Sequence, residues 1–223
     1  MRITWYGHAC FRLQGQGVSL ILDPYSPEGS GLGAVTDTAD YVLMSSSLDE
    51  AHSNWGMIPG SPRVINTLEA VREPIRLVDG LDVSAVAASE GNDRPDNPKA
   101  NAMYWFRLEG IRFCHMGDIG TALTEDQVQP LRGKVDVLFA LAGAGLTIAL
   151  ADLNLAIEAI GPRLVIPMHY WTPRNLYGVG KVDAFLAGRP EDPTVIWESS
   201  SFDLSTESLP ERRTVLVLKA QHG

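Results

Sequence analysis

The order of apolar segments along the chain constrains its fold more than any other feature. In the first half, turn sequences separate short apolar runs at residues 3–6, 10–13, 18–22, 41–44 and 83–88. The polar sequence Gln14-Gly15-Gln16-Gly17 predicts a hairpin between two of these runs. After residue 120, strand-like runs alternate with helix-like segments. We therefore expect an α/β fold of the α+β kind, in which helices cover mixed β-sheets, formed as one domain over residues 1–223.

Turn and capping sequences predict several boundaries. The pair Glu109-Gly110 predicts a tight turn between two strands, and the polar stretch 90–101 predicts an exposed loop. Thr124-Glu125-Asp126-Gln127 has the pattern of a capping box, which predicts a short helix ending near Gly133. The remaining predicted elements are helices at 151–160 and 182–187, and strands at 103–108, 111–116, 135–140, 164–167, 194–197 and 214–218.

Composition and charge exclude several classes of protein. Apolar residues make up 45% of the chain and charged residues 20%, as in a folded globular protein. The formal charge of −9 would repel phosphate backbones and anionic membrane surfaces, so we expect no nucleic-acid and no membrane partner. The sequence has no long apolar segment, no signal-peptide pattern and only two cysteines. We therefore expect a cytoplasmic protein with a small-molecule substrate or ligand, and exposed Trp and Tyr side chains would suit a homodimer.

Four of the five histidines lie near the ends of apolar runs. His8, His115 and His169 each end or follow such a run, Asp118 comes shortly after His115, and His52 follows another run by a few residues. A single histidine in this position is more often a hydrogen-bonded structural residue than a ligand. Four of them with a carboxylate indicate a site at the strand ends, and imidazole with carboxylate suits zinc or iron. The fifth histidine is next to the C-terminus, where we expect disorder.

Short motifs occur in a fixed order along most of the chain. They are Gly7-His8-Ala9-Cys10-Phe11, Leu22-Asp23-Pro24-Tyr25, His115-Met116-Gly117-Asp118-Ile119-Gly120 and Ile166-Pro167-Met168-His169-Tyr170. In this order the sequence resembles the metallo-β-lactamase superfamily, in its branch of small cytoplasmic metal-dependent hydrolases similar to L-ascorbate-6-phosphate lactonase. The resemblance covers residues 1–172. It implies an αββα sandwich of two mixed β-sheets flanked by helices, with a site at one edge between the sheets.

The main metal-binding motif of that superfamily, His-x-His-x-Asp-His, is degenerate in this sequence. In register, the resemblance places Ser46 and Leu48 at the first two histidine positions. It places Glu50 at the aspartate position and Ala51 at the last histidine position. Leucine and alanine side chains carry no ligand atom, so Leu48 and Ala51 cannot bind a metal ion.

The resemblance implies two retained ligand positions, Asp118 as the bridging carboxylate and His169 as the last histidine. Two residues cannot supply the roughly eight ligand contacts of a two-metal site, so we do not expect a binuclear zinc centre. His52, Asp118 and His169 could rebuild a site for one zinc, iron or manganese ion, and Glu90 could add an oxygen ligand. Asp49 lies three residues before His52 and could face the same cleft. The alternative is that these groups hydrogen-bond across a cleft without a metal.

Two functional classes stay open at this stage. The first is a divergent hydrolase of the ester, lactone or phosphoester class with at most one metal, in which Asp118 and His169 are ligands or an acid–base pair. The second is a non-catalytic relative that uses the same fold for binding or assembly. Trp171, Arg174 and Tyr177 could line a pocket, with Arg174 pairing an anionic substrate, and an exposed loop is the alternative.

Overall fold

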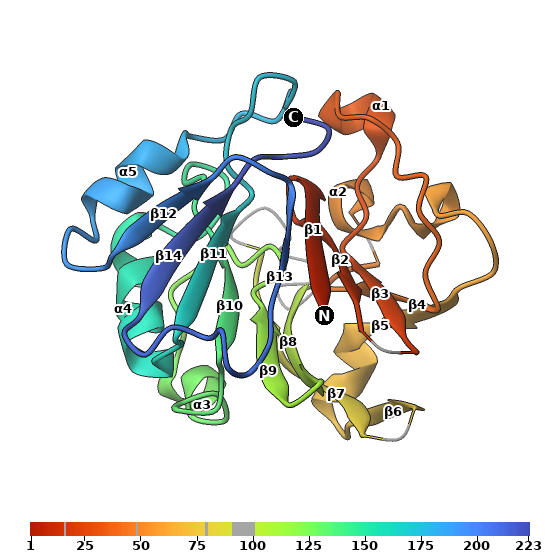
Figure 1. Ribbon diagram of the computed structural model, residues 1–223, viewed down its shortest axis with the longest axis horizontal. Coiled ribbons are helices and arrows are strands. Elements are labelled where there is room, and N and C mark those ends of the chain that lie inside the picture. The colour runs from red at the N-terminus through yellow and green to blue at the C-terminus, as the bar shows by residue number, and fades with distance from the viewer. Residues whose placement is uncertain (16, 48, 79, 91–100) are drawn as a thin grey trace.

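Two β-sheets packed face to face form the body of the protein in the computed structural model (Figure 1), which describes residues 1–15, 17–47, 49–78, 80–90 and 101–223. The six-stranded sheet has the order β13 (Ser201–Asp203), β1 (Arg2–Gly7), β2 (Cys10–Gln14), β3 (Ser19–Leu22), β4 (Tyr41–Met44) and β5 (Arg63–Asn66). The eight-stranded sheet has the order β12 (Thr194–Trp197), β14 (Thr214–Leu218), β11 (Leu164–Met168), β10 (Val137–Leu141), β9 (Ile111–His115), β8 (Asn101–Leu108), β7 (Leu81–Ala88) and β6 (Ile75–Val78).

Both sheets are mixed, as expected. Strands β3, β4 and β5 are parallel to one another, while β13, β1, β2 and β3 pair antiparallel. In the other sheet β6 to β9 pair antiparallel, and β9, β10, β11, β14 and β12 are parallel. The parallel strands bring their carboxyl ends to one edge, which is the upper edge in Figure 1, where the chain ends after β14. This edge carries the candidate site.

The helices are short except for one. They are α1 (Pro27–Ser30), α2 (Glu50–Ser53), α3 (Glu125–Val128), α4 (Leu150–Ile160) and α5 (Val182–Ala187), with 3₁₀ turns at Trp55–Met57 and Thr67–Val71. Helix α4 buries Leu153, Ala156, Ile157 and Ile160 at helical spacing and ends at Gly161, whose φ of 72° closes the helix in the left-handed region. None of the helices in the described ranges is long and apolar enough to cross a membrane.

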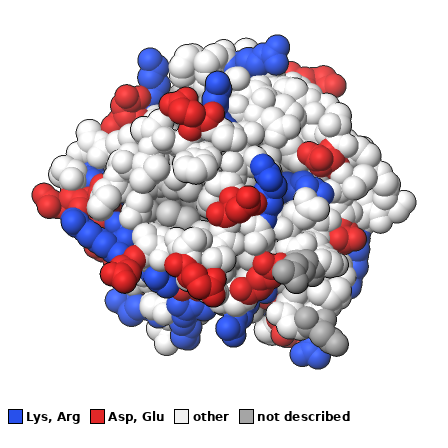
Figure 2. All heavy atoms as spheres, in the orientation of Figure 1, with Lys and Arg blue, Asp and Glu red and all other residues white. Residues whose placement is uncertain are grey.

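The core lies between the sheets and is rich in aromatic side chains. Trp5, Phe11 and Phe139 are fully buried, and the rings of Phe11 and Phe139 have centroids 4.3 Å apart. On the face shown in Figure 2, acidic and basic side chains are interspersed, mostly around its margins. Most of the apolar runs that predicted the strands therefore face inward, and β12, whose residues are all exposed, is an exception.

Most predicted elements are confirmed, several with the predicted bounds: β4, β12, β14 and α5. The capping box is also confirmed, since the backbone N–H of Thr124 donates to Oε1 of Gln127 at 2.8 Å. Sequence patterns did not predict β5, β6 or β13, which have four residues or fewer and partly exposed side chains. Most of the predicted loop 90–101 lies outside the described residues.

The expectation of disorder at the C-terminal histidine is wrong. The Nδ1 atom of His222 lies 2.9 Å from the Tyr25 hydroxyl, and its backbone N–H donates to the carbonyl of Tyr6 at 3.1 Å. The backbone N–H of Gln221 donates to the carbonyl of Trp5 at 3.0 Å. Terminal position alone is a poor guide where the last residues pair with a buried strand, here β1.

Candidate functional site

The turns that leave the strands at the upper edge hold residues in an uncommon backbone conformation. His8 follows β1, Asp23 follows β3 and His169 follows β11, and their φ angles are 50°, 41° and 57°. For residues other than glycine the left-handed region costs free energy, and such residues concentrate at functional sites. The backbone therefore marks these three turns as candidates before any side chain is considered.

Three imidazole rings from distant parts of the chain lie against one another at this edge. The ring centroids of His8 and His169 are 3.8 Å apart, and those of His8 and His52 are 5.0 Å apart. His52 and His169 are stacked, with centroids 5.4 Å apart. All three residues are buried, with at most 4% of their surface exposed. We call His8, His52 and His169 the histidine cluster.

Asp118 lies beside the histidine cluster, so the expected proximity of Asp118 and His169 is confirmed. Its Oδ1 lies 3.6 Å from Nε2 of His169, and its Oδ2 lies 3.7 Å from Nε2 of His52. The backbone N–H of Asp118 donates to Oδ1 of Asn101 at 2.9 Å, which fixes the turn after β9. Asp118 is the most exposed member of the group, with 17% of its side chain accessible.

A second carboxylate, Asp23, holds His52 in place from behind. Asp23 is fully buried and accepts hydrogen bonds from the backbone N–H of Ser45 at 2.8 Å and from the Tyr104 hydroxyl at 3.2 Å. Its Oδ2 lies 2.9 Å from Nδ1 of His52. A carboxylate on one ring nitrogen fixes the orientation of an imidazole and leaves the other nitrogen to face a ligand, as around protein-bound metals.

Several polar atoms of the site make no hydrogen bond although they are buried. They are Nδ1 and Nε2 of His8, Nε2 of His52, Nδ1 of His169 and Oδ1 of Asp118. Burying such groups without partners is costly, so each calls for an explanation. Ligand atoms of His8, His52 and His169 lie within 4.8 Å of one another, as do those of Asp49, His52 and Asp118. Each of these two groups offers imidazole or carboxylate ligands that suit a divalent metal ion.

The pKa values of the site depart strongly from their ordinary ranges. Burial and the neighbouring imidazoles lower the pKa of His8 and of His169, so both rings are neutral and able to bind a metal. Burial would lower the pKa of His52 as well, but Asp23 and Asp118 raise it to about 9. Burial raises the pKa of Asp118 to about 7, with Glu90 and Asp49 adding to the effect and His52 opposing it.

Close packing fixes the turns that carry these groups. A Cβ atom on Gly143 would lie 1.9 Å from the carbonyl oxygen of His169, so only glycine fits there. At Gly117, whose φ is 63°, a Cβ atom would lie 2.5 Å from Oδ1 of Asn101. The ring of Tyr177 covers His8 from outside, with centroids 4.6 Å apart. The turns that carry the site are therefore tightly supported, and Tyr177 packs against the histidine cluster.

The structure brings together the predicted site residues Asp49, His52, Asp118 and His169, while Glu90 raises the pKa of Asp118 from the end of β7. Of the degenerate motif, Ser46 is buried beyond β4, Glu50 and Ala51 begin α2, and Leu48 lies outside the described residues. His52 lies on helix α2, and its ring contacts His8 and His169 although the residue comes one position after the motif.

His115 does not join the cluster, and two other residues were overlooked as site residues. His115 is satisfied locally, because its Nε2 lies 2.9 Å from the Ala9 carbonyl oxygen and its Nδ1 accepts from the Gly117 N–H at 3.0 Å. His8 and Asp23 belong to the site. Sequence reasoning placed His8 among the four histidines at strand ends but left it out of the proposed ligand set, and it assigned Asp23 no role. The signal for both was present, since each directly follows a strand in the same way as His169.

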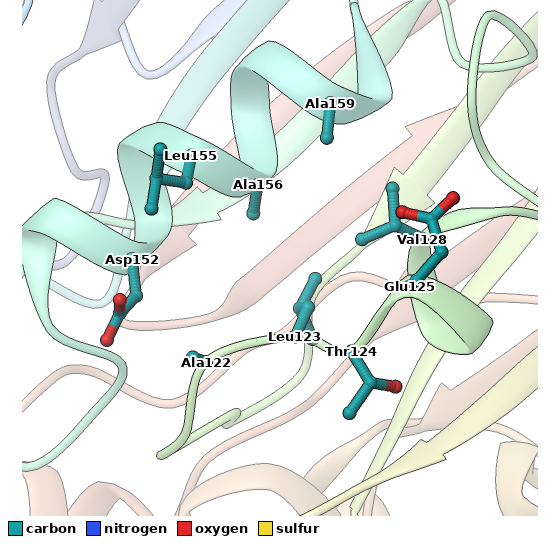
Figure 3. A pocket seen from close by; sticks show the side chains of 9 residues that line it. All are labelled: Ala122, Leu123, Thr124, Glu125, Val128, Asp152, Leu155, Ala156 and Ala159. Carbon is teal, nitrogen blue, oxygen red and sulfur yellow. The ribbon is translucent and has the colours of Figure 1, made fainter.

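Two surface hollows lie away from the histidine cluster. The one in Figure 3 is a small groove of about 150 Å³ between the start of α3 and one side of α4, and its polar lining residues are Thr124, Glu125 and Asp152. Glu125 is paired with Arg132 at 2.8 Å. A larger apolar groove of about 440 Å³ lies by β12, β13 and β14 and includes Trp197 and Phe202. Neither groove includes a histidine.

Comparisons with known proteins agree with this geometry. The sequence profile described as the beta-lactamase superfamily domain matches residues 2–169. A UPF0173 protein of Pyrococcus furiosus is 30% identical over 190 residues, covering 77% of this chain and 84% of that protein. A UPF0173 metal-dependent hydrolase of Methanoculleus marisnigri is 30% identical over 190 residues, covering 77% and 82%. A Thermotoga maritima crystal structure, described as a candidate zinc-dependent hydrolase of the metallo-β-lactamase superfamily, matches with a TM-score of 0.73, 29% identity and 97% coverage of each chain.

Proposed function

The chain belongs to the beta-lactamase superfamily and to its UPF0173 group, and we propose that it is a hydrolase that uses one divalent metal ion. The observation that supports this most is the set of buried, unpaired nitrogen and oxygen atoms on His8, His52, His169 and Asp118. A metal ion would give one nitrogen of each ring and the Asp118 oxygen a partner, whereas hydrogen bonds within the site do not. Similarity to a relative named as a metal-dependent hydrolase adds support.

The histidine cluster would hold the ion, with Asp118 completing the donor set. A divalent ion bound there supplies Lewis acidity, both for activating water and for polarising the oxygen of an ester, lactone or phosphoester bond. Asp49 and Glu90 stay candidates for a further oxygen ligand, as the sequence predicted. One ion, rather than two, agrees with the loss of histidine at Ala51 in the motif.

The residues around the donor set have separate tasks in this proposal. Asp118 is the one member with an exposed part, so its carboxylate is placed to take a proton from water and return it to a leaving group. Asp23 orients His52 through Nδ1. Tyr177 covers His8 and limits the access of bulk water to the cluster.

Burial of the cluster favours one competing function, a non-catalytic binding or assembly protein. The three imidazoles expose at most 4% of their surface, and a substrate needs access to the reacting atoms. In that case the cluster would hold a metal for stability alone or hold none.

The experiment is metal analysis of protein purified without an affinity tag or added metal, followed by hydrolysis assays with neutral and phosphorylated esters. About one zinc, iron or manganese ion per chain, with hydrolysis that a chelator abolishes and the metal restores, supports the hydrolase. One ion without hydrolysis of any ester class favours the binding protein. No metal, and no stabilisation on adding metal, contradicts the proposed function.

A further inference from the structure

We propose that the substrate carries no negative charge at its reacting group, as in a neutral ester, lactone or amide, and that phosphoesters are poor substrates. This inference deepens the metal-dependent hydrolysis proposed above and rests on it. It follows from the charges that surround the histidine cluster.

Four carboxylates lie around the histidine cluster. Asp23 lies 2.9 Å from Nδ1 of His52, and Asp118 lies 3.7 Å from Nε2 of the same ring. Asp49 places an oxygen within 4.8 Å of ligand atoms of His52 and Asp118. Glu90 is near enough to raise the pKa of Asp118. The site is thus surrounded by acidic groups on at least three elements.

One divalent ion offsets only two of these four negative charges. The loaded site therefore keeps a net negative charge, because the imidazoles that bind the metal are neutral. Glu50 is a fifth carboxylate, and it lies near Tyr177, which covers His8. Burial raises the pKa of Tyr177, and the charges of Asp49 and Glu50 raise it further. A phosphoester anion approaching this site is repelled, whereas a neutral carbonyl compound is not.

Arg174 and Lys181 are the basic residues that follow His169 most closely in the sequence, and each lies near a group outside the histidine cluster. Burial lowers the pKa of His222 and the charge of Arg174 adds to the fall, so Arg174 lies near the C-terminal tail. The Lys181 ammonium lies 5.2 Å above the ring of Trp171. The segment 91–100, outside the described residues, contains two acidic and two basic residues and so adds no formal charge. A bidentate arginine clamp for phosphate, as Arg174 could have provided, is not formed by these groups.

Exposed apolar side chains occur close in sequence to the site residues. Trp55 follows His52 by three residues and is 51% exposed, and Leu176 precedes Tyr177 and is 72% exposed. Uncharged side chains at these positions place no cation beside the site residues in sequence to attract a phosphate group.

The binding test uses zinc-loaded protein whose zinc content is measured first. Titration calorimetry should show weak binding of inorganic phosphate to the wild type, with a Kd above about 10 mM. The double variant Glu50→Gln with Glu90→Gln should bind phosphate at least about tenfold more tightly, because like-charge repulsion falls. Glu191→Gln is the matched control, since Glu191 is exposed near the start of β12 at the opposite edge of the sheet, and it should leave phosphate binding unchanged.

The kinetic arm compares phenyl acetate with phenyl phosphate. The wild type should prefer phenyl acetate in kcat/KM by at least about tenfold, and the double variant should narrow that ratio. Tight phosphate binding by the zinc-loaded wild type, or a preference for phenyl phosphate, would overturn the inference and leave metal-dependent hydrolysis standing. Equal phosphate affinity of wild type and double variant would also overturn it. A protein that takes up none of zinc, iron and manganese would instead contradict the proposed function itself.

Discussion

Two polar groups in this protein have opposite characters: the buried histidine cluster and a partly exposed ion network beside α4. In the ion network, the guanidinium of Arg189 lies 2.6 Å from Asp192 and 2.8 Å from Glu158, and Arg213 contacts both carboxylates at 3.0 and 2.6 Å. Arg189 also donates to Asn154 at 3.1 Å. Its charged groups are paired, whereas the histidine cluster leaves several nitrogens without a partner.

Whether the polar atoms of a group are paired separates structural from functional polar groups in this fold. A network whose members satisfy one another stabilises the folded state or specifies it, and needs nothing further. A buried cluster that is only partly satisfied, and held by left-handed backbone at His8 and His169, costs stability. Natural proteins violate local rules of this kind mainly at functional sites. The predictions below test that separation.

The largest effect is expected from breaking the ion network. Arg189→Met should lower the free energy of unfolding by about 3–5 kcal/mol, because it leaves Asp192 buried with one partner fewer. Denaturant unfolding measures the loss. Below the unfolding transition the variant should bind zinc with the same affinity as the wild type. A weakened zinc affinity in the folded variant would show that the two groups are coupled.

Removing a histidine of the cluster should weaken zinc binding without lowering the stability of the metal-free protein. His8→Ala should weaken zinc binding by more than about 100-fold, beyond the range for loss of a supporting residue, while the metal-free protein keeps its stability or gains some. Competition with a chromogenic chelator measures the affinity. His222→Ala is the matched control, because His222 packs against Tyr6 and Tyr25 and not against the cluster. Equal zinc affinities for the two variants would remove His8 from the site.

Asp23→Asn should weaken zinc binding by about 10–100-fold, since the residue orients His52 without touching the metal. The effect should be smaller than that of His8→Ala, and zinc should still bind with one ion per chain. Isothermal titration calorimetry gives both quantities. An effect as large as that of His8→Ala would mean that Asp23 is itself a ligand.

His52 and Asp118 should respond to pH in the opposite direction to Asp192 of the ion network. The pKa of His52 rises from 6.5 to about 9 on folding, so its stabilising effect is complete below pH 6.5 and is lost as the pH rises through 9. Asp118, with a pKa raised to about 7, acts in the same direction. The arginines of the network, working against the effect of burial, lower the pKa of Asp192, so its contribution is lost in acid instead.

The metal-free protein should therefore lose at least about 1.4 kcal/mol of stability between pH 6.5 and 9, the equivalent of one pKa unit. Thermal unfolding measured across this range, with His52→Gln as the comparison, tests the assignment. The variant should show a flatter profile. A wild-type stability that rises toward pH 9 would contradict the raised pKa of His52.

Much of the fold was predictable because its elements have strong local signals. The apolar runs, the Glu109-Gly110 turn and the capping box at Thr124 predicted strands and a helix that the structure confirms. The short strands β5, β6 and β13 were not predicted, since three or four partly exposed residues carry little periodicity.

The candidate site was predictable only in part. Asp118, His169 and His52 were identified as ligands. His8 was recognised only as one of four histidines at strand ends, and Asp23 was assigned no role, although both follow strands in the same way as His169. A position at a strand end does not say which imidazoles meet, because that depends on how two sheets pack. Burial, nitrogen atoms without hydrogen-bond partners and backbone strain identify the histidines of the site, and none of these is visible in the sequence.

The central claim is that the unpaired atoms of the histidine cluster exist to bind one metal ion, and zinc titration of the metal-free protein at pH 7.5 tests it most directly. We predict saturation at one zinc ion per chain in the wild type, no saturable binding in a variant that combines His8→Ala with His169→Ala, and unchanged binding in Arg189→Met. Two ions per chain, or an ion bound equally well by the double histidine variant, would contradict the account.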